Sequence, residues 1–418
     1  MSIVSEINRV NNNIADAYTS VGNKGGTLPQ VRNSANLSSA IDSIPAGGGG
    51  GSVESNDVNF YDYDGILLHS YSASEFAELT TMPENPTHQG LTAQGWNWSL
   101  ADAKEYVAEY GMLDVGQMYV TDDGKTRIYI TLEEGRLEPY LGFAINGTAT
   151  VDWGDGNTET VTGTSRSTAV YTQHSYAQAG DYTIVINCTS GSCSIQGNSS
   201  RGSTLIGNEN MSTNSEAYVY QNCIKKIEVG DNILLGSNAF EKCGSLQSIT
   251  IPKETDVGYM NIFSYCYSLR CIVVPTATTS IGQNSFQYCY AVQKIVLPDS
   301  ITSINTYAFY NCASITRLVI RSAYTIESNV FTYCNSLTRI YIPAVTSKIN
   351  SYAFRYCRGL KYVVFLNSTK VPTLVNTNAL QGISSDCKII VPDALYEDWI
   401  VATNWSTYAS KIVKESEA

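Results

Sequence analysis

A regular spacing of apolar residues dominates the carboxy-terminal half of the chain. Phe recurs at 240, 263, 286, 309, 331 and 354 and Cys at 243, 266, 289, 312, 334 and 357, both in steps of 23, 23, 23, 22 and 23 residues. An aliphatic residue lies three positions after each Cys. An alternating apolar pair such as Ile249/Ile251 comes next, often with Pro after it. This period predicts a solenoid, in which each coil buries its apolar edge on the next and contributes one short strand.

The amino-terminal 45 residues have a different period. Ile3, Ile7, Val10, Ile14, Ala17 and Val21 are spaced alternately by four and three positions. This heptad pattern predicts a short coiled coil, and its β-branched residues favour a trimer. A lone amphipathic helix packed on a neighbouring protein stays an equal alternative, because so short a seam is marginal in isolation. A second short helix is predicted at 34–44, and the glycines of 46–51 predict a flexible tether.

Residues 58–138 read as a small α+β domain. The sequence predicts one hairpin that turns at Asp64-Gly65 and a second, over 117–132, that turns at Asp123-Gly124. Between them, 99–111 has the signals of a helix, with a Ser cap at its start and a Gly at its end. Trp96 and Trp98 are predicted to be buried anchors for this helix, rather than a platform for sugars.

Residues 139–196 predict short β-strands. The stretches TVDWGDGNTETV (150–161) and YTQHSYAQAGDYTIVI (171–186) resemble the PKD-repeat family, which implies an immunoglobulin-like sandwich of two sheets. Asp155-Gly156 fits the tight turn between strands. We interpret Asp152, Asp155 and His174 as turn and core hydrogen-bonding residues rather than catalytic groups, and a calcium ion at the two Asp residues stays open.

The repeat itself, with its A-F-x-x-C and I-x-I-P pieces, resembles the BspA-type leucine-rich repeat, a family of bacterial surface and phage proteins with adhesive roles. The stretch 388–412 breaks the pattern and is predicted to be a closing cap. The predicted fold class is multidomain and mainly β. Its parts are a helical oligomerisation or virion-attachment head (1–45), a Gly-rich linker (46–57), a small α+β domain (58–138), a PKD-like β-sandwich (139–196), a connector (197–222), a BspA-type leucine-rich-repeat solenoid (223–370) and a C-terminal capping region (371–418).

The six repeated Cys residues are predicted to be buried apolar filler. Equivalent atoms of adjacent coils lie about 4.7–4.9 Å apart, so distance alone does not exclude disulfides. A zinc site is disfavoured, since a ladder supplies one sulfur per layer and no point of convergence. No signal peptide is visible in MSIVSEINRVNNNI, so we expect the protein to fold in a cytoplasm with its 11 Cys as thiols.

The positions that vary between copies are rich in Tyr and Asn. Stacked along a solenoid, they would form one polar-aromatic strip that resembles the composition of antibody contact loops. We expect this strip, rather than a merely solvated turn side, to bind a ligand. The predicted ligand-binding residues are Tyr265, Tyr267, Tyr288, Tyr290, Tyr307, Asn311, Tyr333, Asn335, Tyr352, Tyr356 and Arg358.

Composition narrows the possible partners. The net charge of −12 argues against nucleic acid or an anionic membrane as the main partner, and no stretch is apolar enough to insert into a bilayer. The three His residues lack a catalytic motif, and the acidic residues of the repeats sit at unrelated offsets. The sequence therefore predicts no catalytic, cofactor-binding or metal-binding residue, and a glycan-cleaving tail enzyme is the less favoured interpretation.

The order of the modules resembles gut-phage or prophage tail proteins. This resemblance implies a non-catalytic receptor-binding tail adhesin, made in the host cytoplasm and carried on the virion. Its partners would be a bacterial cell-surface glycan or protein, other tail or baseplate proteins through 1–45, and further copies of the chain, with a trimer favoured. A bacterial surface adhesin or protein-binding scaffold, located on the cell surface, is the alternative.

Overall fold

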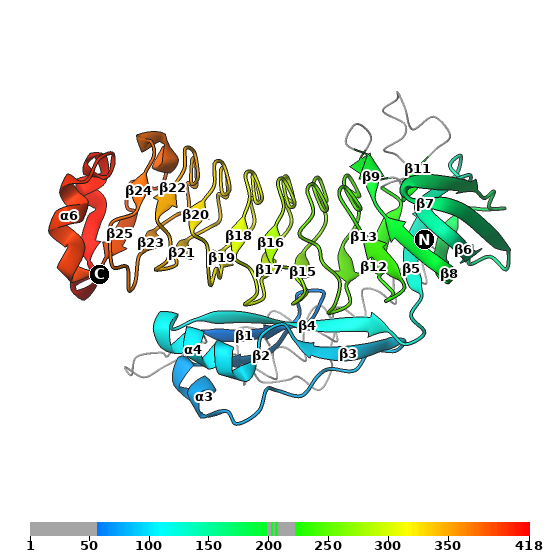
Figure 1. Cartoon of the computed structure of the whole chain (residues 1–418), viewed down its shortest axis with the longest axis horizontal. Helices are drawn as coiled ribbons and strands as arrows, with labels where there is room; N and C mark the ends of the chain where they lie inside the picture. Colours follow the sequence, from blue (N-terminus) through cyan, green and yellow to red (C-terminus); the bar gives the residue numbers. More distant parts are fainter. Residues whose placement is uncertain (1–56, 199–201, 204, 208–221) are drawn as a thin grey trace, which may run out of the picture. The chain divides into compact units, whose positions relative to one another are not determined.

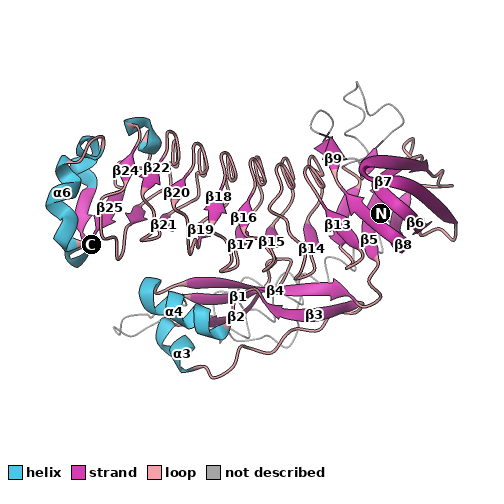
Figure 2. Ribbon diagram, viewed as in Figure 1, coloured by secondary structure: helices cyan, strands magenta, loops and turns pink. Residues whose placement is uncertain are grey.

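The computed structural model describes residues 57–198, 202–203, 205–207 and 222–418, and this part is mainly β with few helices (Figures 1 and 2). The predicted head (1–45), nearly all of the predicted linker (46–57) and most of the predicted connector (197–222) lie outside the described residues. The predicted trimer and the contacts through 1–45 therefore stay predictions. Within the described ranges, no helix is long and apolar enough to cross a membrane.

The first described unit is a small α+β domain. Its elements are β1 (Val58–Tyr61), β2 (Leu67–Tyr71), α3 (Ala73–Glu78), β3 (Leu91–Trp96), α4 (Leu100–Tyr110) and β4 (Leu113–Thr121), with sheet order β2-β1-β4-β3. The predicted hairpin at Asp64-Gly65 is confirmed, since β1 and β2 pair in antiparallel fashion. The predicted helix is confirmed too: the Ser99 hydroxyl accepts a hydrogen bond from the Asp102 amide, and Gly111 ends α4 with a φ of +72°.

The predicted hairpin over 117–132 is wrong. A turn does form, and Gly124 donates its amide to the Thr121 carbonyl. However, β5 (Thr126–Leu132) pairs with β8 (Gly180–Ile195) and β12 (Ile224–Glu228), and not with β4. The reason lies in the buried face of β5, since Ile128 and Ile130 belong to the core that continues into the repeats. Apolar alternation showed that this segment is a strand and did not show which sheet takes it.

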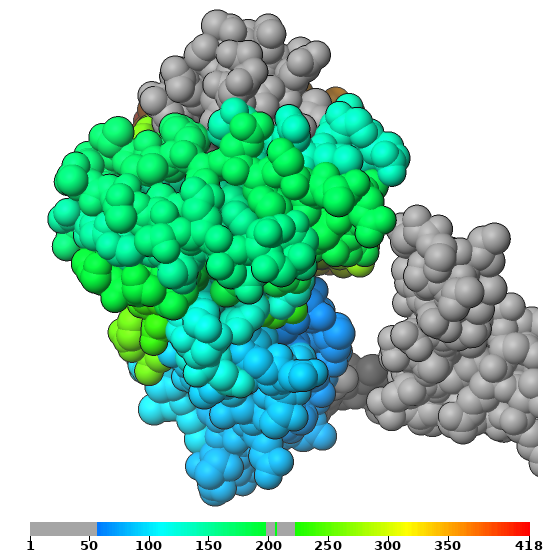
Figure 3. Space-filling model, turned by 90° about the vertical axis from the view of Figure 1, so that its right-hand side faces the viewer, coloured from blue at the N-terminus to red at the C-terminus, as the bar shows by residue number. Residues whose placement is uncertain are grey.

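Three long strands follow, rather than the short ones predicted. These are β6 (Tyr140–Asp152), β7 (Thr158–Gln173) and β8, which hydrogen bonds join in one sheet with order β11-β6-β8-β5-β12-β14. Here β11 is Ile206–Gly207 and β14 is Ser248–Thr250, while β7 pairs with β6 and β13 (Ile233–Leu235) with β8; β9 (Gly197–Asn198) and β10 (Gly202–Ser203) form a separate pair. In Figure 3 the segment that contains β6, β7 and β8 faces the viewer, in green. The two-sheet PKD-like sandwich stays a prediction.

The turn after β6 has the chemistry predicted for it. The Asp155 carboxylate accepts the Asn157 amide at 3.1 Å and lies 2.7 Å from His174 Nε2. The His174 ring stacks on the buried Trp153 ring at 4.9 Å, and the Tyr176 hydroxyl donates to the Trp153 carbonyl at 2.9 Å. Turn formation is thus confirmed for Asp155, and His174 hydrogen-bonds to this turn while its ring packs on Trp153. No group of three or more potential metal ligands occurs among the described residues.

The repeats stack as two parallel rows of short strands. The main strand ladder comprises β12, β14, β15 (Cys271–Val273), β17 (Lys294–Val296), β19 (Arg317–Leu318), β21 (Arg339–Tyr341), β23 (Tyr362–Val364), β25 (Lys388–Val391) and β26 (Ile412–Lys414). The second row comprises β13, β16 (Ser280–Ile281), β18 (Ser303–Ile304), β20 (Thr325–Ile326), β22 (Lys348–Ile349) and β24 (Thr373–Leu374). Figure 1 shows these strands succeeding one another coil by coil. Since Cys271 pairs with Lys294 and Arg317 with Arg339, the strand register follows the sequence period.

The repeated Phe and Cys residues fill the interior. The six Phe rings stack on one another with centroids 5.3–5.7 Å apart. The six Cys side chains are fully buried, and no disulfide forms among the described residues, which confirms the prediction of apolar filler. Five thiols also donate to the Phe carbonyl of the preceding coil, as Cys289 Sγ does to Phe263 O at 3.1 Å. The sequence period had not indicated this second role.

The strand ladder continues beyond the six copies. The stretch 388–412 was predicted to break the pattern, yet β25 pairs in parallel with β23, and β26 with β25. The helix α6 (Tyr396–Val401) and short 3-10 turns η1 (Thr377–Leu380), η2 (Asp393–Leu395), η3 (Trp405–Lys411) and η4 (Glu415–Glu417) flank these strands. Trp399 and Trp405 are buried beside Phe365, with the Trp399 ring 4.5 Å from the Phe365 ring. These large rings replace the Phe-Cys interior of a regular coil.

The small α+β domain contacts the main strand ladder directly. The Trp98 indole donates to the Leu297 carbonyl at 2.8 Å, and the Asn97 side chain donates to the Val296 carbonyl at 3.1 Å. Trp96 and Trp98 are both buried, and Trp98 packs on Tyr106 of α4, so the prediction of buried anchors is confirmed. The outward-facing Val296 joins a small apolar cluster with residues of the domain. The domain therefore occupies the strand side of several coils.

Candidate functional site

The variable positions of the repeats share an unusual backbone conformation. The residues two before and two after each Phe all have φ between +56° and +67°. They are Asn238, Lys242, Asn261, Tyr265, Asn284, Tyr288, Tyr307, Asn311, Asn329, Tyr333, Tyr352 and Tyr356. Asn tolerates this left-handed region, whereas a bulky side chain there is a genuine outlier. Much of the Asn in these repeats is thus explained by the turn geometry, and the Tyr is not.

The position two before Phe holds a structural ladder of amides. Asn261 Nδ2 donates to Asn238 Oδ1 at 2.8 Å, and Asn284 Nδ2 donates to Asn261 Oδ1 at 2.9 Å. The predicted site residues Tyr307 and Tyr352 take this position in two other copies, where both are half-buried. They extend the aromatic surface at the places where the amide ladder stops.

The position two after Phe holds a row of stacked phenol rings. The Tyr265 and Tyr288 rings lie 4.9 Å apart, and the Tyr333 and Tyr356 rings lie 5.2 Å apart. Asn311 interrupts the row, but Tyr310 bridges the gap, 5.4 Å from Tyr288 and 5.7 Å from Tyr333 in edge-to-face contacts. We call Tyr265, Tyr288, Tyr310, Tyr333 and Tyr356 the tyrosine ladder.

Sequence reasoning missed Tyr310. It lies one residue after Phe309, where the other copies have Glu241, Ser264, Gln287, Thr332 and Arg355. The sequence did carry a signal for it. This copy has Asn at 311, where most other copies have Tyr, and it has a Tyr directly before that position. The other ladder residues were predicted, and the structure brings their rings together.

A second row lies at the position after each Cys, and it is the more exposed of the two. The Tyr267 and Tyr290 side chains are 45% and 42% exposed and stack at 5.5 Å with nearly parallel rings. Each also meets the ladder edge-on, Tyr267 at Tyr265 and Tyr290 at Tyr288. Asn335 and Arg358 are exposed at the same repeat position. We call Tyr267, Tyr290, Asn335 and Arg358 the outer row.

Three phenols of this face have a raised pKa. Burial raises the pKa of Tyr265, Tyr267 and Tyr310, and neighbouring Tyr residues add to the effect. A phenol hydroxyl is both a hydrogen-bond donor and an acceptor. At the amino-terminal end, burial raises the pKa of the Glu241 carboxyl to about 7, although Lys242 Nζ lies 4.0 Å from it. Glu241 Oε2 has no hydrogen-bond partner in the described part of the chain.

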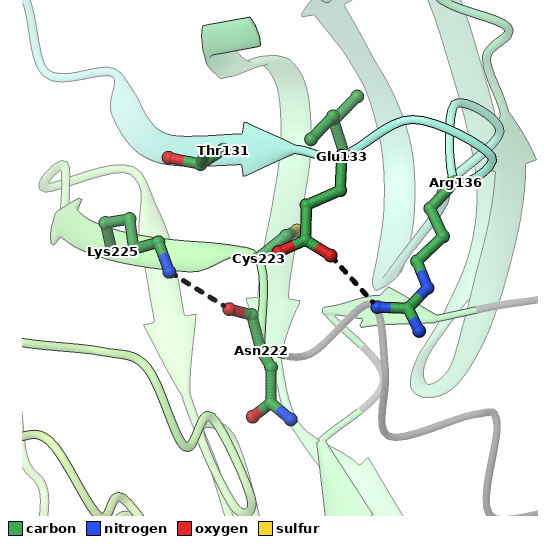
Figure 4. Close-up of a pocket in the computed structure, with 7 residues that line it drawn as sticks. Thr131, Glu133, Arg136, Asn222, Cys223 and Lys225 are labelled. Carbon is green, nitrogen blue, oxygen red and sulfur yellow. Dashed lines mark hydrogen bonds and ion pairs between the residues drawn. The ribbon is translucent and has the colours of Figure 1, made fainter. Parts of the chain in front are cut away.

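Pockets lie away from this face of the repeats. A pocket of about 70 Å³ is lined by Thr131, Leu132, Glu133, Arg136, Asn222, Cys223 and Lys225 (Figure 4). Glu133 pairs with Arg136 at 3.2 Å, and burial raises the pKa of the Cys223 thiol to about 12, so this Cys is no nucleophile. A wider pocket of about 550 Å³ lies beside β13, with Arg166, Asp231, Leu234, Glu254 and Tyr259 among its lining residues. Neither has a catalytic arrangement.

Histidine offers no catalytic centre in the described ranges. His88 Nε2 lies 2.7 Å from Asp62, as His174 does from Asp155, but neither imidazole is hydrogen-bonded to a Ser, Thr or Cys side chain there.

Comparison with known families bears on the repeats. Residues 204–299 and 259–384 match the model of the BspA type leucine rich repeat region, in six copies. The predicted BspA-type repeats are thereby confirmed. No curated protein matches the chain.

Several solved structures are similar to part of the chain. The T. pallidum leucine rich repeat protein is 25% identical, with 36% of this chain and 80% of that chain covered and a TM-score of 0.28. A leucine-rich repeat protein from Bacteroides ovatus is 17% identical (46% and 66% covered, TM-score 0.21). A leucine rich cell surface protein from Faecalibacterium prausnitzii is 18% identical (46% and 73% covered, TM-score 0.22). With every TM-score below 0.5, these likenesses add no argument about function.

Proposed function

We propose, from the premise that residues 204–384 are BspA-type leucine-rich repeats, that this chain is an adhesin or partner-binding scaffold without catalytic activity. It binds a bacterial cell-surface glycan or protein through the tyrosine ladder and the outer row. The observation that supports this proposal is the pair of exposed, stacked rings of Tyr267 and Tyr290 on a supporting layer of further Tyr rings. Tyr provides large contact area with few rotatable bonds and a hydroxyl that hydrogen-bonds, which suits it to recognition.

The position of the small α+β domain favours the turn side of the repeats as the binding face. Trp98 and Asn97 hydrogen-bond to carbonyls of the main strand ladder, and Asp114 pairs with Arg317 of β19. The strand side of these coils is therefore already occupied by the chain itself. A ligand that contacts several adjacent coils can therefore reach them at the turns around the repeated Phe residues, where the tyrosine ladder lies.

The finer assignments are part of the proposal. We infer a leucine-rich-repeat solenoid over 223–370 with a closing cap over 371–418, and a PKD-like sandwich over 139–196 that acts as a spacer. None of the matches given above is a phage protein. The virion location, the tail or baseplate partners of 1–45 and the trimer therefore remain predictions from sequence resemblance, with a location on the bacterial surface as the alternative.

Replacement of both exposed rings tests the proposal. The Tyr267→Ser/Tyr290→Ser variant of the full chain should lose binding to isolated bacterial envelopes by at least about tenfold, because it removes the two exposed aromatic contacts. Tyr324→Ser is the matched control, since its ring is 66% exposed outside the ladder. Binding is measured by co-sedimentation with envelopes, and folding by circular dichroism. Unchanged binding of the double variant would remove the proposal.

A further inference from the structure

Two guanidinium groups lie at the carboxy-terminal end of the tyrosine ladder. The Arg355 guanidinium carbon is 4.6 Å from the centroid of the Tyr356 ring and 4.9 Å from that of Tyr352. The Arg358 guanidinium carbon is 5.8 Å from the Tyr356 centroid. Cation–π attraction at these separations holds each cation against an aromatic surface and leaves N–H groups available at its edge.

These two cations are positioned but not neutralised. Arg355 Nε donates to Gln381 Oε1 at 3.0 Å, and its Nη2 donates to the Tyr356 hydroxyl at 3.3 Å. Neither Arg355 nor Arg358 forms an ion pair with a carboxylate of the described residues. By contrast, Arg127 pairs with Asp123, and Arg321 with several acids.

The ring beneath the two cations is held from two sides. The Tyr333 ring lies 5.2 Å away. Gly382 approaches the ring closely: it has a φ of +74°, and a Cβ atom there would lie 2.4 Å from Tyr356 Cδ1. Only glycine fits this contact without a shift of the ring. Since Tyr356 is fixed, the two guanidinium groups that rest on it are preorganised, which lowers the entropic cost of binding.

We propose that Arg355 and Arg358 form an anion subsite at the end of the tyrosine ladder, and that the ligand of this face is an acidic glycan. The inference rests on the proposed function and names the chemical class of its ligand. The sugar rings lie along the phenols of the ladder and the outer row. The guanidinium groups bind a carboxylate or a sulfate of the glycan, because Arg donates paired N–H groups that match the oxygens of such groups.

The net charge of the chain affects how binding of an acidic glycan depends on salt. A protein of net charge −12 repels a polyanion at long range, so attraction must arise from this local pair. Charges more than about 10 Å apart are largely screened at 0.1 M salt, so added salt reduces the long-range repulsion while the guanidinium groups still contact the anion. Binding of the acidic glycan should therefore depend on the salt concentration, whereas binding of a neutral glycan through the phenol rings should not.

Calorimetry on the full chain tests the subsite with three polymers: polygalacturonate for carboxylates, dextran sulfate for sulfates and dextran as the neutral reference. We expect at least one acidic polymer to bind more tightly than dextran, and the one that does identifies the anion. Arg355→Gln and Arg358→Gln should each weaken that binding about tenfold, the value of one charge-assisted hydrogen bond. Arg270→Gln, at an exposed Arg outside the ladder, changes the net charge equally and should have no effect.

The failure of this inference is distinguishable from failure of the proposed function. Equal binding of acidic and neutral polymers, binding of none of them, or no effect of the two Arg replacements overturns the anion subsite. Equal binding of polyglutamate overturns the glycan as the ligand class. If envelope binding is still lost in Tyr267→Ser/Tyr290→Ser but kept in Arg355→Gln/Arg358→Gln, the adhesin stands and the subsite falls.

Discussion

The ion pair between Asp114 and Arg317 joins the small α+β domain to β19 in the fourth repeat, and its removal should be costly. Asp114 is 5% exposed, and its carboxylate accepts hydrogen bonds from Arg317 Nε, at 3.1 Å, and Nη2. Lys294 Nζ lies 3.8 Å from the same carboxylate. Asp114→Ala leaves the partly buried Arg317 guanidinium with the Asp57 and Leu113 carbonyls as acceptors. Breaking a fully buried pair from one side costs about 3–5 kcal/mol, which is an upper limit here because the Arg317 side chain is 20% exposed.

Urea unfolding of the full chain measures this loss. The double variant Asp114→Leu/Arg317→Met should recover most of the stability, because it removes both charges and leaves apolar side chains of similar volume. Glu133→Gln is the matched control, since the exposed Glu133–Arg136 pair should contribute at most about 1 kcal/mol. A loss below about 1 kcal/mol in Asp114→Ala, or no recovery in the double variant, would refute the view that a buried charge pair holds the domain on the strand ladder.

Two further predictions follow from buried titratable groups. Burial raises the pKa of Glu241 from its usual 4.5 to about 7, so the folded state binds more protons than the unfolded state between these values, and stability should fall as pH rises from about 4.5 to 7. Glu241→Gln should remove the contribution of Glu241 to this slope in urea titrations at several pH values, and a slope equal to that of the unchanged protein would contradict the assignment. Burial also raises the pKa of Cys289 and Cys334 to about 12, so iodoacetamide should leave both unlabelled in the folded protein and label them only in urea, as read by peptide mass spectrometry. Rapid labelling without denaturant would show that the coils open.

The interior of the repeats was predictable because a strict period fixes it. A residue such as Phe286 recurs at nearly constant spacing, and stacking then places each ring on the next. The turn conformation was also encoded, since Asn at repeated positions such as 261 and 284 is a mark of left-handed backbone. The side chains of these Asn residues bond to one another along the stack, rather than standing free on a binding strip.

The contacts between distant segments could not be predicted in the same way. The alternating pattern of β5 fits any sheet, and only the packing of Ile128 and Ile130 into the shared core selects its partners. The sequence held one sign that the α+β domain packs on the repeats, because Val273 and Val296 are apolar residues on the outward face of their strands. Such residues indicate a covered surface without naming the cover. Tyr310 was missed because it lies outside the register from which the ladder was read.

The energetics of the tyrosine ladder bear on why Tyr stands at these positions. A left-handed conformation costs a residue with a Cβ roughly 1–2 kcal/mol, and the penalty is smaller for Asn, whose side chain bonds locally. An aromatic pair such as Tyr265–Tyr288 returns about 0.5–1.5 kcal/mol beyond its burial. Stacking therefore roughly offsets the strain, and Tyr has no clear advantage over Asn for folding alone. The outer row has still less to gain from folding, because Tyr267 and Tyr290 leave more than two-fifths of their surface in water. A role outside folding would account for both rows, and for this reason we propose recognition through their rings and hydroxyls.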